Sequence, residues 1–265
     1  MDDLSQKKFF KITNKKENHH GFQYTDGLNI LKEPFAEKGS CVAGGLYFTD
    51  INNIFEFLNF GIYLREITLP FDDPDFKIVK DRNKWRANKI ILGKRYNLWE
   101  KETFEYLVSI GANVHAFSDF PLSWASGNGY LDVVKYLVSI GANVHVDNEY
   151  PLMYASVEGR LEVVKYLISV GANIHANNDS AIRHASEEGH LDVVKYLISV
   201  GANIHANNDS AIKHASEEGH LDVVKYLVAM GADIHSMNNY AVKYASKEGH
   251  TDVVNYLVSL GAKLS

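Results

Sequence analysis

The sequence has few of the features that mark secreted or membrane proteins. Its 265 residues contain a single cysteine, Cys41, so an internal disulfide is excluded and a reducing cytosolic or nuclear setting is indicated. No apolar run approaches the roughly 20 residues needed to cross a bilayer. The segment Met1–Phe10 has no apolar core of the kind that directs secretion. These absences predict a globular protein that is neither secreted nor bound to a membrane.

Positive charge is also scarce over most of the chain. Residues 1–100 contain 16 Lys and Arg against 14 Asp and Glu, a net charge of +2, whereas residues 101–265 contain 11 against 19, a net charge of −8. An acidic surface repels phosphate backbones, so nucleic-acid binding is not expected of this larger part. A protein partner with a basic or mixed surface is the better electrostatic match.

The sequence instead has a strict repeat of 30 residues. A Gly-Ala pair marks each period, and a degenerate half-copy ends at Val114. The pair returns at Gly111, Gly141, Gly171, Gly201, Gly231 and Gly261, and the five full copies are 115–144, 145–174, 175–204, 205–234 and 235–264. A fixed period of this length is typical of stacked repeats, in which each unit buries its apolar face only against its neighbours.

Each unit is predicted to contain two short helices. In the copy 175–204, Ser180–Glu188 is compatible with a helix, and Gly189 supplies a turn that needs a positive φ. A second helix is predicted over Leu191–Val200 and ends at Gly201. Its apolar residues share one helical face, namely Leu191, Val194, Leu197 and Ile198. Antiparallel helix pairs joined by polar loops therefore form the layers.

The stretches GHLDVVKYLISVGANIHA and YPLMYASVEGRLEVVKYL resemble ankyrin repeats, and the resemblance covers roughly residues 95–265. It implies a mainly α fold, an ankyrin solenoid over 93–265, with a concave face that binds a protein partner. The period is 30 residues where the family usually has 33, and the missing residues fall between Ala176 and Ser180. We therefore expect the β-hairpin fingers of the family to be short or absent.

Residues 1–92 have a different pattern and are predicted to form a small α+β domain. Segments rich in aromatic and β-branched residues indicate strands, and a helix is expected over Ile51–Asn59, capped by Asp50. The strand segments are Phe9–Thr13, Gly45–Thr49, Tyr63–Leu69 and Phe76–Lys80. Because Trp85–Glu100 is no flexible linker, we expect the two parts to pack together. The region resembles the uncharacterised N-terminal domain of ankyrin-repeat proteins from giant DNA viruses of amoebae (mimivirus-like), which implies no activity.

Two catalytic interpretations compete with structural ones in this domain. His20-Gly21 followed by Gly45–Thr49 is weakly similar to the NAD-binding pattern of ADP-ribosyltransferases, which implies that His20 binds NAD, Tyr47 stacks on nicotinamide and Glu66 is the catalytic acid. The alternative is an ordinary turn into a core strand. Cys41 beside His19 or His20 suggests a nucleophile and base, whereas a lone cysteine is more often a small buried apolar residue.

One histidine per repeat suggests a metal site at first sight. The residues are His115, His145, His175, His205 and His235. Helix layers lie roughly 10 Å apart, whereas zinc bonds are about 2.0–2.1 Å long, so successive histidines cannot share one ion. We predict instead that these side chains hold the loops together by hydrogen bonds, with neither a metal nor another cofactor.

Recognition can be encoded where surface residues differ between otherwise constant copies. The variable positions lie at the start of the first helix and in the loop before it, and large aromatic residues there are the usual anchors of protein interfaces. The predicted partner-binding residues are Phe117, Phe120, Trp124, Tyr150, Met153, Tyr154, Arg183, His184, Lys213 and His214. In the alternative interpretation, Trp124 and Tyr154 pack between layers or against the N-terminal domain.

The sequence therefore favours a monomeric, non-enzymatic interaction module or adaptor. Its expected partner is a host protein, and its expected location is the host cytoplasm, with the virion or nucleus as alternatives. A rival hypothesis places an ADP-ribosyltransferase-like enzyme in the N-terminal domain, with the repeats selecting its substrate. A third is a structural component of the virion.

Overall fold

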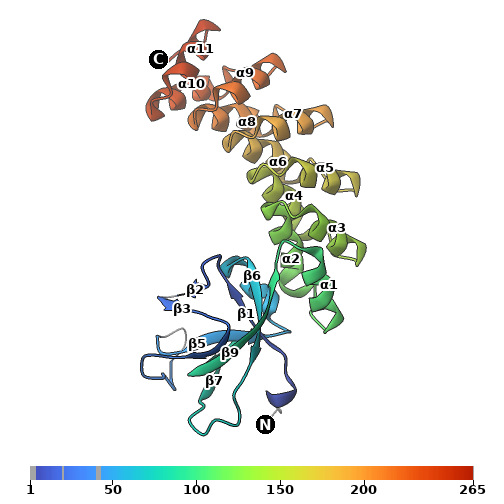
Figure 1. Cartoon of the computed structure of the whole chain (residues 1–265). Coiled ribbons are helices and arrows are strands. Elements are labelled where there is room, and N and C mark those ends of the chain that lie inside the picture. Colours follow the sequence, from blue (N-terminus) through green and yellow to red (C-terminus); the bar gives the residue numbers. More distant parts are fainter. Residues whose placement is uncertain (1–3, 20, 40–42, 265) are drawn as a thin grey trace. The chain divides into compact units, whose positions relative to one another are not determined.

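The computed structural model describes residues 4–19, 21–39 and 43–264. These residues form two compact units, Met1–Pro121 and Leu122–Ser265 (Figure 1). The predicted division between residues 92 and 93 falls inside a strand, Lys89–Asn97, of the first unit. The extent of the repeat array, 93–265, stays a prediction, and the two compact units are described separately below.

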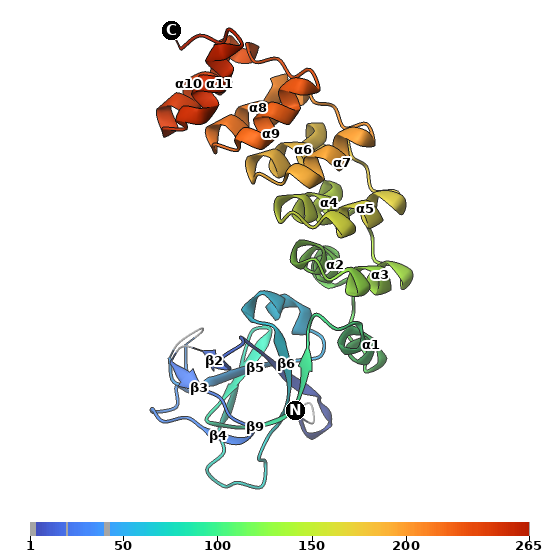
Figure 2. The same ribbon diagram turned by 45° about the horizontal axis from the view of Figure 1, so that its top comes forward.

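The first unit is built on a seven-stranded antiparallel sheet (Figure 2). The strand order is β4-β9-β6-β1-β5-β8-β7. The short strands β2 and β3, which lie between β1 and β4 in the sequence, form a separate pair. The bounds are β1 Phe9–Thr13, β2 Asn18–His19, β3 Phe22–Gln23, β4 Gly27–Ile30, β5 Leu46–Asp50, β6 Tyr63–Thr68, β7 Ile78–Asp81, β8 Lys84–Ala87 and β9 Lys89–Asn97. One face of the sheet packs Phe9 at right angles against Phe48 and Trp85.

The predicted α+β character of this part is confirmed, with differences in detail. The four predicted strands correspond to β1, β5, β6 and β7. The helical segments that the structure describes within residues 1–92 are short 3₁₀ helices, η1 over Leu4–Gln6 and η2 over Ile54–Phe60. The predicted cap at Asp50 is wrong, since Asp50 ends β5 and its carboxylate accepts a hydrogen bond from Asn53 (2.9 Å). The segment Trp85–Glu100, predicted to connect the two parts, contributes most of β8 and all of β9.

The helix of the half-repeat, α1 (Lys101–Ser109), belongs to this first unit. Phe104 on α1 is fully buried and stacks on Phe55 of η2, with ring centroids 5.8 Å apart. The hydroxyls of Tyr96 on β9 and Tyr106 on α1 both donate to one carboxylate oxygen of Glu66. The start of the repeat region therefore shares a core with the sheet, as the absence of a linker predicts.

The second unit consists of stacked helix pairs. The first helices, α4, α6, α8 and α10, lie side by side in both views, and the second helices form a parallel row (Figures 1 and 2). The bounds are α2 Ala116–Asn128, which crosses the unit boundary, then α3 Leu131–Ser139, α4 Val146–Val157, α5 Leu161–Ser169, α6 Ala176–Glu187, α7 Leu191–Ser199, α8 Ala206–Glu217, α9 Leu221–Ala229, α10 Ser236–Glu248 and α11 Thr251–Ser259. None of the described helices is both long and apolar enough to cross a membrane.

The buried face of each second helix differs slightly from the predicted one. Val193, Val194 and Leu197 are fully buried on α7, whereas Leu191 and Ile198 are only partly covered. The same three positions are buried on α3, α5 and α9. Each copy thus contributes the same narrow apolar stripe to its neighbours.

A left-handed turn replaces the hairpin finger in every repeat. Three consecutive residues take positive φ angles, which in the third copy are 50° at Asn177, 55° at Asn178 and 55° at Asp179. Asn and Asp tolerate this region better than other residues with a side chain, because their short polar groups bond locally. Throughout residues 98–264, which the structure describes without a gap, there is no strand. The prediction of short or absent fingers is therefore confirmed.

The left-handed turn makes a test of backbone strain possible at Asn178, whose side chain is exposed. We expect Asn178→Val to lower the free energy of unfolding by about 1–2 kcal/mol, because a β-branched residue is strained at positive φ. Asn178→Gly removes the same amide without that strain and should stay within about 1 kcal/mol of the wild type. Urea unfolding followed by circular dichroism measures both. Equal losses in the two variants would show that the amide, and not the backbone angle, matters.

The histidine of each unit holds this turn together. Nδ1 of His175 donates to Oδ1 of Asp179 (3.0 Å), and the backbone N–H of His175 donates to Asn173 (3.0 Å). The buried Asp179 carboxylate also accepts from the backbone N–H of Asn203, in the loop at the end of the same copy (2.8 Å). The same pattern recurs at His205, where Asp209 accepts from Asp233. The prediction that these histidines connect the loops by hydrogen bonds is confirmed.

A bond between neighbouring repeats starts at the turn between the two helices. Nε2 of His190 bonds to the carbonyl of Val157 (2.8 Å), and Nε2 of His220 bonds to that of Glu187 (2.8 Å). Each ring also covers the glycine of the preceding turn, so a Cβ on Gly189 would come within 2.6 Å of the His220 ring. The side-chain amide of Asn177 also donates to the carbonyl of Asn148 in the preceding copy (3.1 Å), so neighbouring copies are bonded to α6 near both of its ends, which fixes the orientation of that helix.

Candidate partner-binding surface

The exposed side of α4, α6, α8 and α10 forms a continuous surface within the second unit, which we call the first-helix face. It is defined by residues at equivalent positions of successive copies, namely Tyr150, Met153, Tyr154, Arg183, His184, Lys213, His214, Tyr240 and Tyr244. Because hydrogen bonds to neighbouring copies hold both ends of α4 and α6, this part of the face is presented by rigid elements.

The face begins with an aromatic pair on α4. The rings of Tyr150 and Tyr154 are 4.9 Å apart, and Tyr154 is 39% exposed. Tyr154 lies over Gly127 of the preceding helix, where an added Cβ would come within 2.5 Å of the ring. Met153 beside them is partly exposed. This end of the face therefore offers an apolar contact with two hydroxyl groups.

The middle of the face is polar and mixed in charge. On α6, Arg183 donates to Nε2 of His184 (3.0 Å), so Nδ1 carries the ring proton and donates to Glu187 (3.2 Å). Burial, followed by the nearby Arg183, lowers the pKa of His184, which agrees with this neutral form. On α8, His214 lies 3.8 Å from Glu217.

Lys213 is buried on this face and not presented to solvent. Its ammonium group contacts the sulfur of Met237 (3.0 Å) and the carbonyl of Asn207 (3.4 Å), and it lies over the ring of Tyr240. Burial lowers the pKa of Lys213. A partner can therefore contact the partly exposed Arg183 directly, whereas Met237 and Tyr240 lie against the ammonium group of Lys213.

A second aromatic pair lies at the other end of the face, on α10. The rings of Tyr240 and Tyr244 are stacked at 3.8 Å, and the Tyr240 hydroxyl lies 3.5 Å from a carboxylate oxygen of Glu217. This pair was among the varying positions but not among the predicted partner-binding residues. The signal that could have identified it is its register, since Tyr240 and Tyr244 occupy the positions of Tyr150 and Tyr154.

The predicted residues at the start of the array do not join this face. Phe117 (45% exposed) and Phe120 (partly exposed) belong to the first unit. Trp124 is only 5% exposed, and its ring packs edge-on against Tyr130 at 5.3 Å. The prediction of Trp124 as an exposed anchor is therefore wrong, because its indole is buried within the array.

Tyr47 and Glu66, which the enzymatic hypothesis places in one site, are not brought together. Tyr47 lines a cavity beside β1 and β5, whereas Glu66 lines a different hollow and is held there by Tyr96 and Tyr106. His20 and Cys41, on which the NAD and nucleophile interpretations depended, lie outside the described residues. Among the described residues, Tyr47 and Glu66 therefore do not share a site.

Comparisons with known proteins identify the repeat region. A family model of ankyrin repeats (3 copies) matches residues 96–178 and 182–265. An ankyrin repeat protein of Acanthamoeba polyphaga mimivirus is 51% identical over 136 residues, which cover 50% of this chain and 67% of the relative.

Two further relatives come from the same virus. Another ankyrin repeat protein is 49% identical over 144 residues, 49% of this chain and 47% of that protein. An uncharacterized protein is 50% identical over 134 residues, 49% of this chain and 97% of that protein. The predicted resemblance to repeat proteins of giant amoebal viruses is confirmed by these matches.

Proposed function

Because this chain belongs to the ankyrin-repeat family, whose repeats are generally protein-interaction modules, we propose that it is an adaptor that binds a host protein through the first-helix face. The proposed role is non-catalytic, and the proposed setting is the cytoplasm of the host cell, where the protein acts as a monomer.

The observation that carries this proposal is the arrangement of the face itself. Two aromatic pairs, Tyr150–Tyr154 and Tyr240–Tyr244, flank a mixed-charge centre at Arg183 and Glu187. Aromatic residues and arginine are the side chains that most often dominate binding energy at protein interfaces. The partner that fits best is a protein segment with two apolar anchors and polar groups of both signs between them.

A capture experiment tests the proposal. The full chain and a Tyr150→Ala/Tyr154→Ala variant serve as bait in amoebal lysate, and retained proteins are quantified by mass spectrometry. We expect at least one protein to be retained about tenfold less by the variant, since an interface hot spot contributes about 2 kcal/mol or more.

The matched control is Tyr196→Ala/Tyr226→Ala. It removes the same number of partly exposed tyrosines from the second helices α7 and α9, on the other side of each layer. We expect this control to retain the partner as the wild type does. Equal retention by both variants would remove the first-helix face as the binding surface, provided that the two proteins unfold at similar temperatures.

A further inference from the structure

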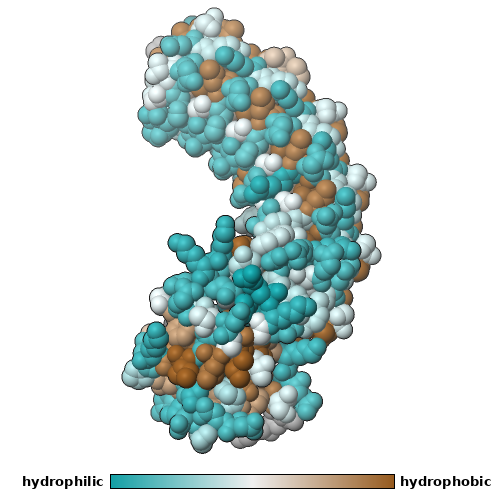
Figure 3. Space-filling view, viewed as in Figure 1, coloured by the Kyte–Doolittle hydropathy of each residue, from teal (hydrophilic) through white to brown (hydrophobic). Residues whose placement is uncertain are grey.

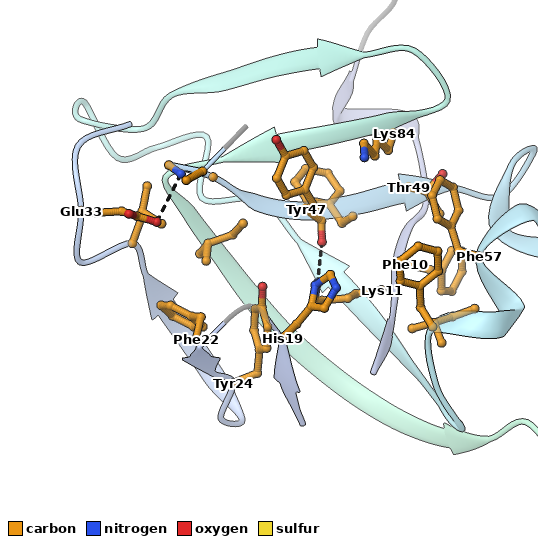
Figure 4. A pocket seen from close by; sticks show the side chains of 18 residues that line it. Phe10, Lys11, His19, Phe22, Tyr24, Glu33, Tyr47, Thr49, Phe57 and Lys84 are labelled. Carbon is orange, nitrogen blue, oxygen red and sulfur yellow. Dashed lines mark hydrogen bonds between the residues drawn. The ribbon is translucent and has the colours of Figure 1, made fainter. Parts of the chain in front are cut away.

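The first unit contains a cavity that the adaptor role does not use. Its volume is about 380 Å³, which lies within the range of pockets for small ligands. It opens beside β1 and β5, and the residues around it include Phe10, Phe22, Tyr24, Tyr47, Phe57 and Phe60 (Figure 4). Apolar side chains also gather on the surface over the strands of this unit (Figure 3). The lining is therefore rich in aromatic side chains.

A buried lysine forms part of the cavity wall. Lys11 is 4% exposed, and its ammonium group donates to the carbonyl of Tyr47 (2.8 Å). The same group lies 4.4 Å from the centre of the Tyr24 ring, within the range of a cation–π contact. Among the described residues, no carboxylate forms an ion pair with Lys11. An ammonium group has three donors, and a single carbonyl satisfies only one of them.

A second cation faces the same space. Lys84 lines the cavity, and its ammonium lies 4.6 Å from the centre of the Tyr47 ring. Burial, and then repulsion by Lys84, lowers the pKa of Lys11 to about 7. The one acidic residue among the described lining residues is Glu33, whose carboxylate accepts from the backbone N–H of Gly44 (3.2 Å) and lies across the cavity from Lys11 (Figure 4). The Lys11 side of the cavity is therefore cationic.

We propose that this cavity binds a small planar aromatic anion, with its ring among the aromatic side chains and its anionic group on the ammonium of Lys11. A buried charge is costly unless it is paired, and an anionic ligand supplies the missing partner. Aromatic rings around the cavity favour a planar body through offset and edge-to-face contacts. This site is independent of the first-helix face and of any protein partner.

Two fluorescent probes of matched shape test the proposal. 8-Anilino-1-naphthalenesulfonate carries an anionic group, and N-phenyl-1-naphthylamine has the same rings without it. Titration of the full chain should show that the anionic probe binds at least tenfold more tightly. In Lys11→Met this preference should fall to about twofold or less, while the neutral probe binds as before. Lys94→Met, which removes an exposed lysine of β9, should leave both affinities unchanged.

Three outcomes would overturn the proposal. One is equal affinity of the two probes for the wild type, and another is an unchanged preference in a folded Lys11→Met protein. The third is displacement of the anionic probe by decanoate as readily as by 2-naphthoate, which would contradict a planar aromatic ligand.

A measurement on the wild type covers the case in which Lys11→Met does not fold. Reductive methylation with formaldehyde and cyanoborohydride, followed by peptide mass spectrometry, reports the reactivity of each lysine. We expect the anionic probe to slow methylation of Lys11 at least fivefold and to leave Lys94 unaffected. Equal methylation of Lys11 with and without the probe would place the probe elsewhere and overturn the proposal.

Discussion

Replacing Lys11 with methionine should raise the free energy of unfolding of the first unit by roughly 2–4 kcal/mol at pH 6, because it removes a buried ammonium group and keeps a side chain of similar length. The ammonium loses its hydration on folding and, among the residues that the structure describes, recovers one hydrogen bond, to the Tyr47 carbonyl, and one contact with the Tyr24 ring. Urea unfolding followed by tryptophan emission measures the change, since Trp85 lies in the same sheet as Lys11.

The lowered pKa of Lys11 also makes the free energy of unfolding of the wild type depend on pH. Burial and Lys84 lower the pKa of folded Lys11 to about 7, below its ordinary value of 10.5. Between these values the unfolded chain binds a proton that the folded chain does not, so wild-type stability should rise by about 2 kcal/mol from pH 7 to pH 9. Lys11→Met should lack this rise. Parallel pH profiles of the two proteins would show that Lys11 keeps its ordinary pKa in the folded state, as expected of a paired charge, and would contradict the prediction.

Trp124→Ala should lower the free energy of unfolding of the array by about 3–5 kcal/mol, because truncation of a buried indole leaves a large cavity. Trp124 is 5% exposed and packs against Tyr130. Tyr154→Ala on the neighbouring helix should cost about 1 kcal/mol, since the Tyr154 ring is 39% exposed and loses less buried area. Thermal and urea unfolding of the two single variants provide the comparison.

This difference decides how the binding surface can be tested. A variant that includes Trp124 would lose its partner through unfolding, whereas Tyr150→Ala/Tyr154→Ala leaves the buried indole in place. Equal stability losses for Trp124→Ala and Tyr154→Ala would contradict the assignment of Trp124 to the core and return it to the candidate surface.

The architecture of the array was predictable because its signal recurs in every copy. The right-handed part of α6 begins at Ser180, where the sequence predicts it, and α7 begins at Leu191. The shortened period also predicted the loss of the hairpin finger. It did not predict the left-handed turn, because three successive positive φ angles are rare and the residues Asn177 and Asn178 indicate only a loop.

The N-terminal sheet was only partly predictable, because strands such as β9 lack a clear alternation of apolar and polar residues. β9 begins with an apolar run at Ile90 and continues into the exposed Lys94 and Arg95. Its second half is stabilised by pairing with β6 and not by burial. Such strands depend on partners distant in the sequence, and local patterns cannot reveal those partners.

The sequence predicted which positions form the candidate face, but it did not predict which of their side chains are exposed. Variation between copies identified Tyr154, Arg183 and His184, which the structure leaves accessible in part. The same criterion selected Trp124 and Lys213, which are buried. Variation shows that a position is free to change, whereas exposure depends on the neighbouring layer. Of the wall of the cavity around Lys11, the sequence singled out Gly45–Thr49 and His19 as site candidates but not Lys11 itself, since the wall comes from segments separated in the chain.

Because bonds between repeats recur from one junction to the next, the gene for this protein can gain or lose whole repeats without disrupting them. Those described above join a unit to its immediate neighbour, as from His190 to Val157 and from His220 to Glu187. Recombination that inserts or deletes 30 residues within the near-identical copies 175–204 and 205–234 recreates the same bonds across the new junction. The array can therefore lengthen or shorten by whole units in a single event, and the length of the docking face can evolve separately from the stability of each layer.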